Sequence, residues 1–155
     1  MKKILLHIGA ADQLATVWLN GILLGEHSGG YLPFSFDVTS VIDSANELVI
    51  RIEDCMSSFV LPYGKQSAKR GGMWYTPVSG LWQTVWLEAV PEEYISGIDI
   101  ETGTDYAKIT LCGNICEGTI KVQTPNGTVE KNTSSYRCGR SAGNSLAQRH
   151  SSWRT

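Results

Sequence analysis

The chain has 155 residues, of which 42% are hydrophobic and 18% are charged. This length suffices for one domain or one and a fraction, and the composition excludes a wholly disordered protein. The net charge of −2 is uneven, because residues 1–130 carry −7 and residues 131–155 carry +5. A basic tail can bind nucleic acid, but this tail has neither a helical stripe nor interleaved aromatic residues. We therefore expect a disordered tail and no nucleic-acid partner.

The cysteines and the N-terminus exclude several other kinds of site. The four cysteines form no Cys-x-x-Cys pair and no histidine lies at zinc-ligand spacing, which predicts isolated thiols, no metal site and no cofactor. Residues 4–11 form an apolar run that is too short to span a membrane. No signal peptide or membrane partner is therefore predicted, and the bacterial cytoplasm and periplasm both stay open as locations.

Alternating apolar and polar residues predict β-strands throughout the first half of the chain. Asn20-Gly21 lies between the apolar runs 14–19 and 22–24, and this dipeptide is the strongest short signal for a β-hairpin. The same reasoning predicts further strands at 4–8, 34–38, 48–53 and 82–86.

Aromatic residues on two of these strands are the expected core. Phe34 and Phe36 share one face of their strand, and Trp82 and Trp86 share one face of another, so we expect all four to fill the interior of a sandwich. Residues 54–80 break the pattern with several glycines and prolines, and predict a long irregular loop of the length that often carries function.

The second half of the chain shows a weaker β pattern that stops early. Short strands are predicted around 98–100, 109–111 and 120–122, too few to close a second sandwich. From Lys131 the sequence is rich in Ser, Arg and Gly and has almost no apolar period. We therefore interpret residues 131–155 as a disordered or aberrant tail, such as one produced by a frameshift.

Six segments between residues 5 and 88 match one known family in order and spacing. They are residues 5–12, 15–21, 25–27, 29–39, 46–51 and 80–88. In these segments the chain resembles the sugar-binding jelly-roll domain of family 2 glycoside hydrolases, the β-galactosidases, β-glucuronidases and β-mannosidases. The resemblance implies an all-β fold: an incomplete antiparallel jelly-roll sandwich over 1–91, of the galactose-binding type, and the beginning of an immunoglobulin-like sandwich over 92–130.

The resemblance also implies where hydrolysis takes place. In this family both catalytic glutamates belong to a (β/α)₈ barrel, which is missing here, so we expect truncation at both ends, no catalytic residue and no activity from this chain alone. Asn46-Glu47 spells the dipeptide that contains the family's acid/base, but it opens an alternating strand, which argues against a catalytic Glu47.

Four loop residues are the predicted substrate-binding groups. Family loops of this domain reach toward the barrel mouth, which implies sugar contacts in the loop 60–79. Lys65 and Gln66 can donate hydrogen bonds to hydroxyl groups, and Trp74 and Tyr75 can stack on a pyranose face. The alternative is that the charged residues only solvate the loop while Trp74 packs beneath it.

The sequence therefore predicts a carbohydrate-binding accessory region of a family 2 β-glycosidase, whose partners are carbohydrate and the missing catalytic barrel. Two alternatives stay open: a stand-alone carbohydrate-binding module, and a gene fragment without independent function. Missing strands leave sheet edges and an apolar face exposed, so we also expect self-association.

Overall fold

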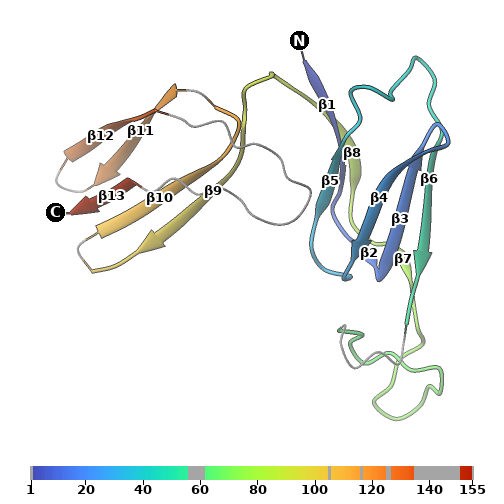
Figure 1. The fold of residues 1–155 in the computed structure, drawn as a ribbon. Helices are drawn as coiled ribbons and strands as arrows, with labels where there is room; N and C mark the ends of the chain where they lie inside the picture. The colour runs from blue at the N-terminus through green and yellow to red at the C-terminus, as the bar shows by residue number, and fades with distance from the viewer. Residues whose placement is uncertain are drawn as a thin grey trace. The chain divides into compact units, whose positions relative to one another are not determined.

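The computed structural model describes residues 2–55, 62–104, 106–115, 117–124, 127–134 and 151–154. All of its regular elements are β-strands (Figure 1). The chain divides into two compact units, which we call the sandwich unit, Lys2–Val90, and the hairpin unit, Pro91–Thr155. The all-β prediction is confirmed, and each unit is described separately below.

The sandwich unit is built from two three-stranded antiparallel sheets and one short strand pair. The sheets have the orders β5-β1-β8 and β4-β3-β6, and β2 pairs with β7. The strands are β1 (Lys3–Ile8), β2 (Ala11–Asp12), β3 (Leu14–Leu19), β4 (Ile22–Ser28), β5 (Phe34–Asp37), β6 (Leu48–Glu53), β7 (Gly80–Leu81) and β8 (Val85–Val90).

The core of this unit comes from alternate residues of its two central strands, as the period of two requires. Leu6 and Ile8 of β1 pack with Val17 and its neighbours in β3, and the members of the buried cluster are Leu6, Ile8, Ala11, Ala15, Val17, Leu19 and Val38. Phe34 and Phe36 pack against this cluster, which confirms their predicted place.

The prediction that Trp82 and Trp86 fill the core is wrong. Trp82 is 53% exposed and lies in the connection between β7 and β8, outside either strand. Trp86 is 43% exposed and pairs in register with His7, on which its ring stacks at 4.7 Å between centroids. Because Leu6 and Ile8 take the inward positions of β1, the neighbouring His7 and its partner Trp86 face outward.

The predicted hairpin between β3 and β4 is confirmed, with Asn20 and Gly21 at φ values of 53° and 77°. Positive φ at both positions is the requirement of a type I′ turn. The Asn20 amide also joins the turn to distant backbone. Its Nδ2 donates to the Val41 carbonyl and to Asn46 Oδ1, each at 2.9 Å, and its Oδ1 accepts from the Glu47 N–H at 2.9 Å.

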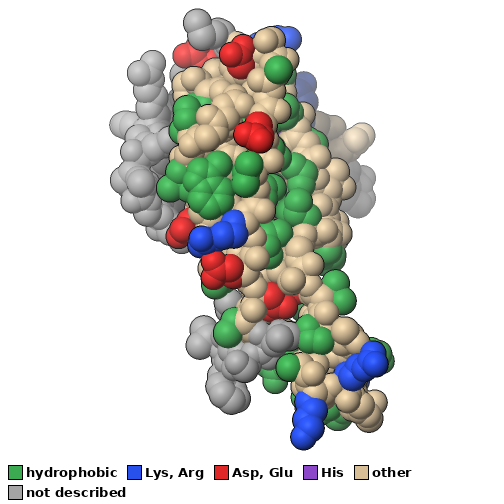
Figure 2. Space-filling view, turned by 90° about the vertical axis from the view of Figure 1, so that its right-hand side faces the viewer, with side chains coloured by type: hydrophobic (Ala, Val, Ile, Leu, Met, Phe, Trp, Pro, Cys, Tyr) green, Lys and Arg blue, Asp and Glu red, His purple; other side chains and the backbone are tan. Residues whose placement is uncertain are grey.

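The outward face of the sheet β4-β3-β6 carries an apolar patch. Trp18 is paired in register with Leu23 on one side and Val49 on the other, and both of these neighbours are about half exposed. Figure 2 faces the side of the sandwich unit where β3 and β6 lie in Figure 1, and shows hydrophobic side chains gathered there with charged side chains around them. Surface of this kind is compatible with the expected self-association.

The hairpin unit contains β9 (Ile95–Thr102), β10 (Tyr106–Gly113), β11 (Glu117–Thr124), β12 (Gly127–Ser134) and β13 (Ser151–Arg154). β10 lies between β9 and β13, and β11 pairs with β12. The three predicted strands are present, and β12 was not predicted. β13 falls within the expected tail, whereas residues 135–150 lie outside the described residues. The immunoglobulin-like assignment and the nature of the tail stay predictions.

Within the residues that the structure describes, no helical segment has the length and apolarity needed to cross a membrane. The same described residues contain no group of three or more His, Cys, Asp or Glu that could hold a metal ion.

Candidate functional site

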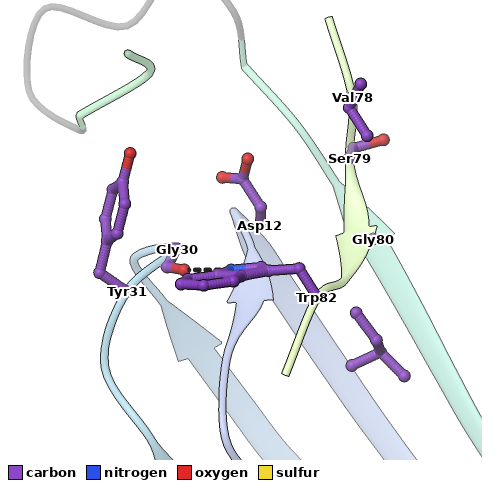
Figure 3. Close-up of a pocket in the computed structure, with 8 residues that line it drawn as sticks. Asp12, Gly30, Tyr31, Val78, Ser79, Gly80 and Trp82 are labelled. Atoms are coloured by element: carbon purple, nitrogen blue, oxygen red, sulfur yellow. Dashed lines mark hydrogen bonds between the residues drawn. The ribbon is translucent and has the colours of Figure 1, made fainter. Parts of the chain in front are cut away.

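A cavity of about 310 Å³ opens at the end of the sandwich where β2 meets β7 (Figure 3). β2 supplies Asp12, the connection between β4 and β5 supplies Gly30 and Tyr31, and the segment through β7 supplies the other walls. The lining residues are Asp12, Gly30, Tyr31, Val78, Ser79, Gly80, Leu81 and Trp82. This volume is at the lower end of the range of small-molecule sites, which suits one sugar ring.

The Trp82 indole is an exposed flat surface on this cavity, and its orientation is fixed. Its Nε1–H donates a hydrogen bond of 2.7 Å to the Gly30 carbonyl, which ties the connection β7–β8 to the connection β4–β5. Tyr31 meets Trp82 edge to face at 6.1 Å between centroids. Figure 3 shows the indole edge-on, with Asp12 and the Tyr31 ring on the same side of it. The exposed indole face is therefore available to stack on a ligand.

Asp12 contributes a carboxylate acceptor to the wall of this cavity. Its Oδ1 is buried, and no described group donates a hydrogen bond to it. The Asp12 carboxylate as a whole belongs to the cavity wall, where it can accept a hydrogen bond from a ligand hydroxyl. A Cβ at Gly30 would come within 2.5 Å of this oxygen, so glycine is needed there to leave the carboxylate its space.

A second acid, Asp54, lies close enough to Asp12 for their charges to interact. Burial, followed by the negative charge of Asp12, raises the pKa of Asp54 above its ordinary value of 3.8. Asp54 does not line the cavity. It therefore adds negative potential near Asp12 without itself contacting a ligand in the cavity.

Asp54→Asn should stabilise the sandwich unit at pH 7 by less than about 1 kcal/mol. Because the pKa of Asp54 is raised in the folded state, the protonated acid favours folding. This contribution to stability is present below the pKa of the unfolded state and is lost as the pH rises through the pKa of the folded state. The amide mimics the neutral acid, so the gain at pH 7 should vanish near pH 3, where wild-type Asp54 is itself protonated. Urea unfolding at both pH values measures this, and a destabilised variant at pH 7 would contradict it.

The four predicted sugar contacts lie together in the neighbouring loop, but none of them lines the cavity. The Tyr75 N–H donates to the Lys65 carbonyl at 2.8 Å, and the Ser67 N–H donates to the Tyr75 carbonyl at 3.1 Å. Trp74 and Tyr75 are 40% and 68% exposed, which leaves their rings accessible. Their role in sugar binding stays a prediction.

Gln66 connects this loop to the cavity. Its side-chain carbonyl accepts a hydrogen bond from the N–H of Val78, a lining residue. The loop is also held at its start, because the buried Gln13 side chain donates to the Pro62 carbonyl at 3.1 Å. The structure thus gives Gln66 a positioning contact within the protein in addition to its predicted donor role.

The sequence did not identify the cavity residues, because each of them also fits a more common structural role. Trp82 fits a strand pattern, and Asp12 has no acidic or basic neighbour at a motif spacing. The glycine pair before Tyr31 was the available hint, since adjacent glycines allow close approach of another group.

Residues 1–75 match the protein family described as glycosyl hydrolase 2 galactose-binding domain-like. The β-glucuronidase of Rattus norvegicus is 30% identical over 121 residues, which are 67% of this chain and 19% of that protein. The β-galactosidase of Thermoanaerobacter pseudethanolicus is 28% identical over 100 residues, which are 63% of this chain and 13% of that protein. The chain thus spans about a fifth or less of the length of these relatives.

Solved structures give the same fold. A Ruminococcus gnavus β-glucuronidase aligns with a TM-score of 0.58 and 24% identity, over 86% of this chain and 25% of that chain. The Bacteroides uniformis β-glucuronidase aligns with a TM-score of 0.59 and 23% identity, over 99% of this chain and 19% of that chain. Identities at this level support the fold assignment alone.

Proposed function

Because residues 1–75 belong to the glycosyl hydrolase 2 galactose-binding-like family, we propose that this chain is the carbohydrate-binding accessory region of a β-glycosidase. The observation that carries the proposal is the cavity whose wall combines the fixed Trp82 indole with the Asp12 carboxylate. An aromatic face and a small number of polar groups are the usual elements of sugar recognition.

The parent activity that we propose is hydrolysis of O-glycosyl bonds, of the β-glucuronidase or β-galactosidase type. Retaining hydrolysis needs two carboxyl groups about 5–5.5 Å apart on either side of the scissile bond. Among the eight described residues that line the cavity, Asp12 is the single carboxyl group. We therefore propose that a catalytic barrel supplies the chemistry and that this chain contributes binding. Lys65, Gln66, Trp74 and Tyr75 would extend the sugar contacts along the neighbouring loop.

The chain should bind simple glycosides, and Trp82→Ala should weaken that binding at least about tenfold, because the variant loses the stacking face. Titration with methyl β-D-galactoside and methyl β-D-glucoside, followed by NMR chemical shifts, measures the affinity. Trp86→Ala is the matched control, because Trp86 is similarly exposed but stacks on His7 outside the cavity. Equal loss in both variants, or binding unaffected by Trp82→Ala, would contradict the assignment of the site.

A stand-alone binding module is the second candidate, and the cavity itself favours it because all of its described walls come from the sandwich unit. Binding that is unchanged when a catalytic barrel from a family member is added would favour the module. Binding that strengthens on that addition would favour the accessory role.

Self-association through exposed strand edges also stays a prediction.

A further inference from the structure

We infer that the cavity over Trp82 receives an uncharged pyranose and discriminates against a uronic acid. The inference rests on the proposed carbohydrate-binding function and adds the class of sugar that the cavity accepts. The expected preference follows from the charges that line this cavity.

The cavity has one charged wall, and that wall is negative. Of its eight described lining residues, Asp12 alone carries a charge, and none is Lys, Arg or His. A ligand hydroxyl group can donate a hydrogen bond to the Asp12 carboxylate in the cavity wall, whereas a uronate carboxylate has no proton with which to do so at pH 7. A carboxylate in the same place would instead meet a like charge at close range.

The surroundings increase this discrimination. The face of an indole ring is the negative side of its quadrupole, so an anion gains nothing by lying over Trp82. Asp54 adds a second acid close to Asp12. The basic residues of the adjacent loop, Lys65, Lys69 and Arg70, are not among the lining residues and therefore offer no counter-charge within the cavity.

The geometry also limits how far the site can adapt to an anion. The hydrogen bond from Trp82 to the Gly30 carbonyl holds the indole plane, and the close approach of Gly30 confines the Asp12 carboxylate.

The test compares methyl β-D-glucoside with methyl β-D-glucuronide on the full chain, at pH 7 and constant ionic strength, by NMR titration. These two ligands differ in the oxidation state and charge at C6. We expect the glucoside to bind at least about tenfold more tightly, which corresponds to about 1.4 kcal/mol. Asp12→Asn keeps a carbonyl acceptor but removes the charge, so it should reduce this preference to about threefold or less.

Asp43→Asn is the matched control, because it removes the same charge from an exposed turn outside the cavity. It should leave the tenfold preference unchanged. Glucuronide binding equal to or tighter than glucoside binding would overturn the inference while the proposed function stands. Failure of both glycosides to bind the folded wild-type chain would overturn the proposed function and the inference with it.

Discussion

Ile8→Ala is expected to lower the free energy of unfolding of the sandwich unit by about 2–5 kcal/mol. Ile8 has no exposed surface and lies in the middle of the buried cluster, between the two sheets. Truncation removes buried methyl and methylene groups and leaves a cavity that the surrounding strands cannot fill without breaking their register. A loss of this size is a large fraction of the stability of a small domain, so much of the variant should be unfolded at 37 °C.

Ile22→Ala is the matched control for this prediction. It removes the same atoms from a residue that is 50% exposed beside the hairpin turn. A cost below about 1 kcal/mol is expected there, because little apolar surface is returned to water. Urea unfolding followed by tryptophan fluorescence compares the two variants. Similar losses for both would mean that the core has been placed wrongly.

Gly25→Ala should destabilise the sandwich unit by about 2–5 kcal/mol, from two separate causes. Gly25 has a φ of +154°, a conformation that residues with a Cβ rarely adopt. A Cβ there would also lie 2.9 Å from Cε1 of Phe36, which packs against the core. The glycine lies at the β-bulge where the register of β3 and β4 shifts next to Val17, so the strand cannot easily relax.

Gly21→Ala separates the two causes. Gly21 has a φ of +77°, but a Cβ there would have no atom within 4 Å. This variant carries backbone strain without collision, and about 1–2 kcal/mol is expected. Thermal unfolding by circular dichroism ranks the two variants. If Gly25→Ala costs no more than Gly21→Ala, the predicted collision with Phe36 is absent.

Five longer strands of the sandwich unit, β1, β3, β4, β5 and β6, could be predicted because their signals are local, whereas β2 and β7 were not predicted and the strand expected at 82–86 begins only at Val85. The runs around Asn20-Gly21 became β3 and β4, and the alternation over residues 48–53 became β6. A hairpin turn and a period of two depend on neighbours in the sequence, so no tertiary information is needed. The resemblance to family 2 glycoside hydrolases then supplied the jelly-roll arrangement that periodicity alone does not.

Exposed aromatics and the cavity could not be predicted because they depend on contacts between distant segments. Alternation places Trp86 on one face of a strand, but which face is buried is decided by its pairing with β1. The cavity combines Asp12 with Trp82, which are far apart in the sequence. β12 was missed for another reason: Val129 is its single large aliphatic residue, which is too weak a pattern to predict a strand.

Asn20 has a consequence for the chemical lifetime of the protein. An asparagine followed by glycine is prone to deamidation, because the unhindered peptide nitrogen of the glycine can attack the side-chain carbonyl carbon. Here both ends of the Asn20 amide are engaged with residues of the loop before β6, so cyclisation requires those bonds to break first. Conversion to aspartate would replace a donor with an anion facing the Val41 carbonyl. The folded state therefore slows deamidation at an Asn-Gly site that is unprotected in the unfolded chain.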